Sequence, residues 1–237
     1  MSSKPIPSSD RLIFAMDVPD TEQARVLANT LGDAVSFYKL GLELAMAGGY
    51  FELIEGLKRM GKKIFADIKF YDIPATVGRA VRRLSGHGVT FATVHGDRAI
   101  MEAAAQASGE IEILAVTVLT SLDDAGLRDL GYAGEVAALV LTRARHARDA
   151  GCAGVIASPL DAAMLRENLG ESLKIVTPGI RPAGERSADD QKRVATVEQA
   201  FADGADHIVV GRPIRDAENP RAAAEAIQKS IAGIFPS

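Results

Sequence analysis

The chain has 237 residues, of which 47% are hydrophobic and 24% are charged, a balance typical of a globular protein with a large core. Its formal net charge is -4, which disfavours general binding to nucleic acid or to an anionic membrane, since both need clustered positive charge. The single cysteine, Cys152, excludes an intrachain disulfide and a cysteine-rich metal site. An anionic ligand would therefore need a local binding site.

Residues 1–10 are a polar segment, and we expect a tail here rather than a signal peptide, because the segment has no apolar core. No later apolar run approaches the roughly 20 residues that a membrane span needs. A cytoplasmic location is the default expectation, and a single folded domain is expected over residues 11–237.

Short apolar runs rich in β-branched residues alternate along the chain with longer amphipathic stretches. Eight candidate strands follow in chain order: 12–16, 35–40, 63–68, 89–94, 111–118, 154–157, 174–177 and 207–210. They show little polar alternation, as expected for strands buried on both faces. Phe51, Ile54 and Leu57 mark the apolar face of one intervening helix, and Asp20 and Thr196 are expected to begin two others as N-caps.

Eight strand–helix units in about 230 residues, with no break in composition, predict an α/β protein with a single closed (β/α)8 (TIM) barrel. A doubly wound open sheet is the alternative. It would usually carry a glycine-rich turn after the first strand, and residues 17–20 contain no glycine. The longest irregular stretch, residues 178–192, is long for such a loop and is expected to be a functional lid.

Charged residues gather at the end of the third predicted strand, where barrel enzymes carry their active sites. Asp67 and Lys69 are two residues apart, so they should point to the same side of the strand. Asp72 follows closely and Lys39 lies on the second strand, so two carboxylates and two ammonium groups should converge. Neighbouring carboxylates keep a lysine protonated, and a protonated lysine can act as a general acid. A structural ion-pair network is the alternative interpretation.

A second cluster of interest follows the last two predicted strands. Arg181 comes after the seventh strand, and Gly211 and Arg212 come after the eighth. Barrels often bind phosphate at these two loops, through backbone N–H groups and a short helix N-terminus, and arginine adds a bidentate contact. The positions predict a phosphate site, with surface arginines on a turn as the alternative. Asp17, Thr120 and Ser158 are further polar residues at the ends of predicted strands.

In this order and spacing, the motifs resemble one family, the bacterial-type orotidine 5′-phosphate decarboxylases, from residue 11 to about residue 227. The motifs that carry the resemblance are Phe14-Ala-Met-Asp17, Tyr38-Lys39-Leu-Gly41, Phe65-Ala-Asp67-Ile-Lys69-Phe-Tyr-Asp72-Ile-Pro74, Val118-Leu-Thr120-Ser121, Thr177-Pro-Gly-Ile-Arg181 and Val210-Gly-Arg212-Pro213. The resemblance implies a carboxy-lyase that converts orotidine 5′-phosphate to UMP and CO₂, the last step of de novo pyrimidine biosynthesis. It implies no cofactor and no metal.

The resemblance also implies roles for single residues. Lys69 is the expected proton donor to pyrimidine C6, and Asp67, Asp72 and Lys39 complete a charged tetrad. An obligate homodimer is implied, in which Asp72 and Thr76 reach the active site of the other subunit. The implied substrate contacts are Asp17, Lys39 and Thr76 at the ribose, Thr120 and Ser158 near the base, Arg181, Gln191, Gly211 and Arg212 at the 5′-phosphate, and in addition Asp67 and Ile73.

Three other functions compete with this one. A magnesium-dependent sugar-phosphate decarboxylase or synthase on the same barrel would need an acid on the second strand, where Lys39 would repel the metal. A Schiff-base aldolase using Lys69 would need a neutral amine, which flanking carboxylates oppose. A non-catalytic sensor of phosphorylated ligands would retain Arg181 and Arg212 but would not need Lys69 among carboxylates.

Overall fold

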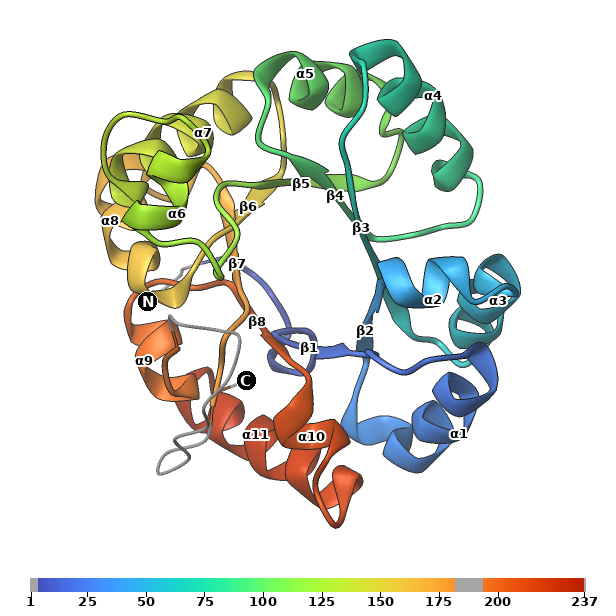
Figure 1. Cartoon of the computed structure of the whole chain (residues 1–237). Coiled ribbons are helices and arrows are strands. Elements are labelled where there is room, and N and C mark those ends of the chain that lie inside the picture. The colour runs from blue at the N-terminus through green and yellow to red at the C-terminus, as the bar shows by residue number, and fades with distance from the viewer. Residues whose placement is uncertain (1–3, 182–193, 237) are drawn as a thin grey trace.

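The computed structural model describes residues 4–181 and 194–236, and in this part of the chain eight parallel strands close into a barrel in sequence order. Helices surround the barrel on the outside (Figure 1). The strands are β1 (Leu12–Ala15), β2 (Phe37–Gly41), β3 (Lys63–Phe70), β4 (Phe91–His95), β5 (Glu112–Val116), β6 (Gly154–Ile156), β7 (Lys174–Thr177) and β8 (His207–Val210). The predicted (β/α)8 barrel is confirmed.

Most of the longer helices between the strands are amphipathic and bury their apolar side chains. Two short 3₁₀ helices, η1 (Ser8–Asp10) and η2 (Gly32–Ala34), accompany them. The α-helices described are α1 (Thr21–Leu31), α2 (Leu42–Met46), α3 (Tyr50–Arg59), α4 (Pro74–Ser85), α5 (Arg98–Ala107), α6 (Asp124–Asp129), α7 (Val136–Asp149), α8 (Pro159–Leu169), α9 (Val197–Ala202), α10 (Arg212–Arg215) and α11 (Pro220–Ile234).

All eight predicted strands are present, and each boundary lies within two residues of the predicted one. β7 and β8 begin and end at the predicted residues, whereas β3 continues past the predicted end to Phe70 and β5 stops earlier, at Val116. Both predicted N-caps are confirmed, because the Asp20 side chain accepts a hydrogen bond from the Gln23 amide and Thr196 accepts one from Gln199.

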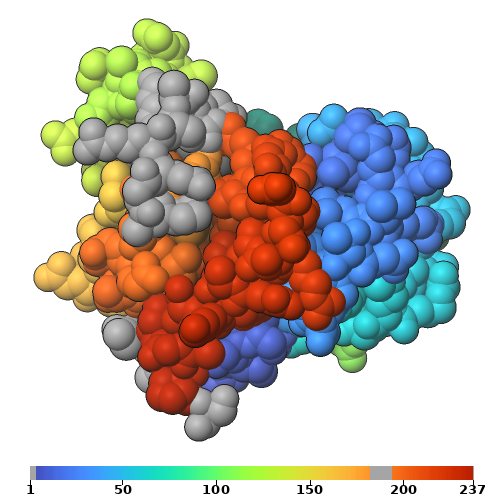
Figure 2. Space-filling view, turned by 90° about the horizontal axis from the view of Figure 1, so that it is seen from below, coloured from blue at the N-terminus to red at the C-terminus, as the bar shows by residue number. Residues whose placement is uncertain are grey.

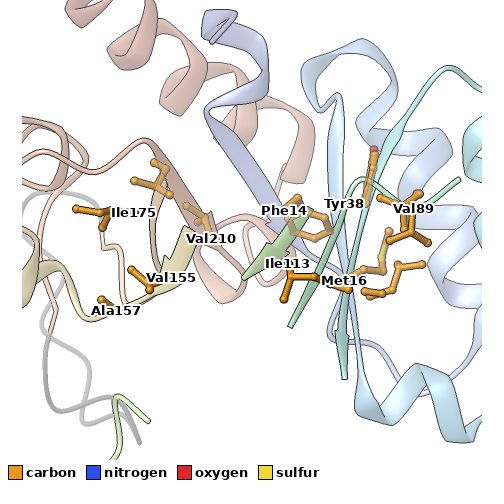
Figure 3. Packing of buried hydrophobic residues seen from close by; sticks show 14 of the residues in the cluster. Phe14, Met16, Tyr38, Val89, Ile113, Val155, Ala157, Ile175 and Val210 are labelled. Atoms are coloured by element: carbon orange, nitrogen blue, oxygen red, sulfur yellow. The ribbon is translucent and has the colours of Figure 1, made fainter. Parts of the chain in front are cut away.

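Side-chain alternation along the strands produces two apolar layers. The layer between strands and helices includes the side chains labelled in Figure 3, among them Phe14, Tyr38, Val155 and Ile175. The layer inside the barrel consists of Ile13, Ala15, Phe37, Phe65, Phe91, Leu114, Val176 and Val209, with Ile156 beside it. Two positions after Phe37 and Phe65, the next inward-facing residues are Lys39 and Asp67. The barrel interior therefore changes from aromatic to charged toward its C-terminal mouth.

The opposite, N-terminal end of the barrel is closed by ion pairs. The carboxylate of Asp206, which is fully buried, accepts hydrogen bonds from Lys4 Nζ at 3.0 Å, Arg166 Nη2 at 2.8 Å and the Ile175 amide at 2.8 Å. Such a buried carboxylate is tolerable because its lone pairs are satisfied. Lys4 thereby fastens the start of the described chain to the barrel. The division of the chain at residue 10 stays a prediction.

The first and last parts of the chain meet where the barrel closes. β1 pairs with β8 in parallel, with Leu12 opposite Ile208, and α11 lies beside α1. Figure 2 shows this neighbourhood, with the red C-terminal helices next to the blue N-terminal region. In the part of the chain that the structure describes, no helix combines the length and the apolar character that crossing a membrane requires.

Candidate active site

A cavity of about 460 Å³ opens at the C-terminal ends of the strands, the end at which barrel enzymes carry their chemistry. One part of its wall is apolar and comprises Ala15, Phe65, Val116, Val118, Leu119, Ile156 and Val209. The polar and glycine positions among the predicted site residues that line it are Asp17, Lys39, Asp67, Lys69, Thr120, Arg181, Gly211 and Arg212. The structure thus brings these predicted residues around one space large enough for a small ligand.

Asp67 lies at the centre of a charged cluster in this cavity. Its Oδ2 is 2.8 Å from Lys69 Nζ and 3.5 Å from Lys39 Nζ, and Lys39 Nζ is also 3.0 Å from Asp17 Oδ1. Signs therefore alternate from Asp17 through Lys39 and Asp67 to Lys69. Among the residues that the structure describes, no three His, Cys, Asp or Glu side chains are grouped so that they could hold a metal ion.

The charges of the cluster maintain one another. Burial alone would raise the pKa of Asp67, but the ammonium groups of Lys39 and Lys69 outweigh it and lower that pKa below the usual value. Burial likewise acts to lower the pKa of Lys39, and the carboxylates of Asp67 and Asp17 reverse the effect and raise it. Both residues are consequently held in their charged forms, although their side chains are only 11% and 12% exposed.

Lys69 reaches Asp67 by a route that regular strand geometry does not provide. Its φ is +54°, which makes it the one non-glycine residue of the described chain with a positive φ. The pairing of β3 with β4 shifts register between Ala66 and Phe70, so a bulge lies at this point. Asp67 and Lys69 were predicted to point to the same side, and the structure brings them together at 2.8 Å, at a bulge rather than along a regular strand.

The other side of the cavity is cationic. Arg181 follows β7, is 8% exposed, and donates from Nη1 to the Ile180 carbonyl oxygen at 2.8 Å. Arg212 is the first residue of α10, directly after β8. Burial, followed by the positive charges of Arg181 and Arg215, lowers the pKa of Arg212 below the ordinary arginine value. An anion between Arg181 and Arg212 would relieve this repulsion between like charges.

Gly211 keeps this side of the cavity close to Asp17. A Cβ at residue 211 would lie 3.3 Å from the Cβ of Ala15 and 3.5 Å from Asp17 Oδ2. A side chain at residue 211 would therefore crowd Ala15, which would have to move by a few tenths of an ångström, and would lie in van der Waals contact with the Asp17 carboxylate. The predicted importance of Gly211 has a steric basis here.

Arg215 lines the same cavity and was missed by the sequence reasoning. Its Nη1 donates to the Asp17 carbonyl oxygen at 2.7 Å, and its Nε donates to Asp216 Oδ1 at 2.6 Å. It ties α10 to the loop after β1. The signal was its position three residues after Arg212, because residues i and i+3 lie on the same side of a helix.

Several predicted site residues lie elsewhere. Ser158 is buried and caps α8, accepting from the Leu160 amide at 3.3 Å. Asp72 is exposed and accepts from the Ile73 amide at 2.6 Å, Ile73 is 65% exposed, and Thr76 accepts from Arg79 Nη2 at 3.2 Å. None of these four lines the cavity. Gln191 and most of the predicted lid lie outside the described residues.

The fold and the site define a (β/α)8-barrel enzyme with an alternating charge cluster on one side of its cavity and an arginine pair on the other. The chain belongs to the Orotidine 5′-phosphate decarboxylase / HUMPS family, whose model matches residues 10–227. The resemblance inferred from the motifs is confirmed by this match.

Named relatives cover nearly the whole chain. The orotidine 5′-phosphate decarboxylase of Methylococcus capsulatus is 58% identical over 235 residues, covering 99% of this chain and 97% of the relative. That of Stenotrophomonas maltophilia is 51% identical, covering 98% of each. Among solved structures, orotidine 5′-phosphate decarboxylase from Lactobacillus acidophilus superposes with a TM-score of 0.83 at 38% identity, covering 94% of this chain and 99% of that one.

Proposed function

We propose that this chain catalyses the decarboxylation of orotidine 5′-phosphate to UMP and CO₂, the final step of de novo pyrimidine biosynthesis. The observation that carries the proposal is the buried Asp67 carboxylate held between the ammonium groups of Lys39 and Lys69, facing a cavity whose other side presents Arg181 and Arg212. Family membership and relatives of 58% and 51% identity that bear this enzyme's name support the same reaction.

The chemistry explains why an ammonium group is needed. When the bond between C6 and the carboxylate carbon breaks, CO₂ leaves and the electron pair stays on C6 in the plane of the pyrimidine ring. The ring π system cannot delocalise a pair in that plane, so the protein must stabilise it electrostatically. Lys69 then transfers a proton from Nζ to C6, which forms the new C–H bond and leaves an amine that regains a proton from solvent.

In this proposal Asp67 and Lys39 prepare Lys69 rather than react. Asp67 Oδ2, 2.8 Å from Lys69 Nζ, holds the ammonium group in place through this ion pair. Lys39, 3.5 Å from the same oxygen, prevents Asp67 from taking up the proton itself. The cluster is thus ordered before substrate arrives, so little reorganisation is needed during the reaction.

The arginine side of the cavity binds the 5′-phosphate, with Arg181, Gly211 and Arg212 as its described contacts. Asp17 and Lys39 lie between this side and Asp67, at the place for the ribose hydroxyl groups. Because the phosphate is remote from the bond that breaks, its binding energy can be used to orient the pyrimidine against Lys69. Thr120 lines the cavity and is a candidate contact for the base.

We also propose a homodimer with shared active sites. Tyr71 and Ile73, which flank Asp72, are 67% and 65% exposed, and large apolar side chains in such a cluster favour contact with another protein surface. A second subunit could insert Asp72 and Thr76 beside Lys69 and complete the charged tetrad.

Lys39 argues against the metal-dependent alternative. A magnesium site here would use carboxylate oxygens, but the Lys39 ammonium already lies 3.0 Å from Asp17 and 3.5 Å from Asp67 and would repel a divalent cation. The deciding experiment is a spectrophotometric assay with orotidine 5′-phosphate, with and without EDTA. We expect turnover that is equal in both conditions. No turnover would refute the proposed activity, and turnover abolished by EDTA would instead support the metal-dependent function.

A further inference from the structure

Thr93 lies directly beneath the charged cluster, on the neighbouring strand β4. It is 0% exposed and follows the inward-facing Phe91 by two positions, so its side chain points into the barrel. Its hydroxyl makes two hydrogen bonds, one with each member of the Asp67–Lys69 pair. The sequence reasoning, which considered only the ends of the strands, did not identify it.

The first hydrogen bond stabilises the bulge. Register between β3 and β4 is regular up to Ala66 opposite Ala92 and resumes at Phe70 opposite Val94, so three residues of β3 lie opposite Thr93 alone. The ladder therefore offers no regular partner for the amide of Lys69. That amide donates instead to Thr93 Oγ1 at 2.9 Å. A side-chain oxygen thus replaces a backbone acceptor at the residue with the unusual φ of +54°.

The second hydrogen bond fixes the carboxylate. A hydroxyl has one proton, and because its oxygen accepts from Lys69, that proton is available for Asp67 Oδ1, 2.9 Å away. Oδ1 is thereby occupied, which leaves Oδ2 to face both ammonium groups. The bond from Thr93 is also one of the interactions that favour the charged form of Asp67.

We infer that Thr93 is a positioning residue for the reaction: its hydroxyl couples the backbone of Lys69 to the carboxylate of Asp67 and so sets the direction of the Lys69 ammonium group. The inference rests on the proposed function, because it concerns the group that delivers the proton. In this role Thr93 need not contact the substrate or bind the phosphate, because Arg181 and Arg212 lie on the other side of the cavity.

The test compares Thr93→Ser with Thr93→Ala, two variants that differ from each other only in the hydroxyl group. Thr93→Val adds an isosteric variant that keeps the shape and loses both hydrogen bonds. We expect Thr93→Ser to retain kcat within about threefold, and Thr93→Ala and Thr93→Val to lose on the order of 10- to 100-fold, because a small misplacement of a reacting group is costly. The dissociation constant for UMP should change by less than about threefold in all three, since the phosphate contacts remain.

The outcomes separate this inference from the proposed function. If the wild-type protein does not decarboxylate orotidine 5′-phosphate, the proposed function fails. If the wild type is active and Thr93→Ala matches Thr93→Ser in kcat, the positioning role is wrong. A parallel loss of kcat and UMP affinity would also overturn it, because it would indicate general disruption of the fold. Should Thr93→Val fail to fold, the comparison of serine with alanine still decides.

Discussion

His207 begins β8 at the N-terminal end of the barrel, where its ring packs edge-to-face against Phe37 and Phe91. Its Nδ1 lies 2.8 Å from the carbonyl oxygen of Asp10, which can only accept, so Nδ1 carries the proton. Nε2 is buried and has no hydrogen-bond partner among the described residues. Burial lowers the pKa of His207 to about 4, since a second proton would place an unpaired charge in the core.

This environment predicts a loss of stability in mild acid. The unfolded chain takes up a proton on His207 below its ordinary pKa of 6.5, whereas the folded protein resists until about pH 4. Stability from this residue is therefore complete above pH 6.5 and is lost as the pH falls toward 4. A difference from 6.5 to about 4, at roughly 1.36 kcal/mol per pH unit, corresponds to about 3 kcal/mol in the free energy of unfolding. Roughly 2 kcal/mol of this should be lost by pH 5.

Two variants separate titration from packing. His207→Asn keeps an N–H group that can donate to the Asp10 carbonyl but does not titrate, and His207→Phe keeps a ring but loses the donor. Urea unfolding at constant ionic strength between pH 8 and pH 5 gives the free energy of unfolding of each. Both variants should be less stable than the wild type at pH 8 and should lose about 2 kcal/mol less than it does on acidification to pH 5.

Carboxylates also titrate between pH 8 and pH 5, but they contribute equally to all three proteins. The loss of free energy of unfolding over this pH range is therefore compared between the wild type and each variant. If the wild type and both variants lose the same free energy between pH 8 and pH 5, His207 is not the group responsible and the reasoning is wrong. If only one variant loses the pH dependence, packing rather than protonation explains the effect.

Three further predictions concern the active site. Lys69→Ala should lower kcat by at least about 10⁴-fold while UMP still binds, because the proton donor and the stabilising charge are lost together. Normal turnover by this variant would refute the role proposed for Lys69. Mixing Lys69→Ala and Asp72→Ala subunits should restore about a quarter of wild-type activity, since half the dimers are hybrids with one intact site of two; no recovery, with subunit exchange verified, would argue against shared sites. Arg212→Ala should lower kcat/KM by roughly 10- to 150-fold through a charge-assisted phosphate contact, and unchanged kcat/KM would place the phosphate elsewhere.

The barrel could be predicted because its strands are buried on both faces and read as apolar runs, such as 174–177 and 207–210, that the structure reproduces without change. Strand order then followed from chain order, and the C-terminal ends located Asp67, Lys39, Arg181 and Gly211. The single rule that active-site residues lie at the C-terminal ends of barrel strands was enough to group residues that are far apart in the sequence.

The local geometry of β3 could not be predicted in the same way. Positive φ angles usually occur at glycine or asparagine, and residue 69 is a lysine. The sequence therefore does not indicate a positive φ at this position. Alternation predicted that Asp67 and Lys69 share one side of the strand, but it did not predict the bulge at which their side chains meet. Thr93 follows Phe91 by two positions, so the same alternation predicts an inward-facing hydroxyl one layer below the strand ends.

Stability and chemistry are separated along the barrel axis. At the N-terminal end, Asp206 has three hydrogen-bond donors at 2.8 to 3.0 Å and forms no part of the cavity. At the C-terminal end, Lys69 has an unfavourable backbone conformation that a sequence selected for stability alone would replace with glycine. Glycine would relieve the strain and remove the ammonium group. The strain is therefore best explained by the requirement for a lysine at the bulge.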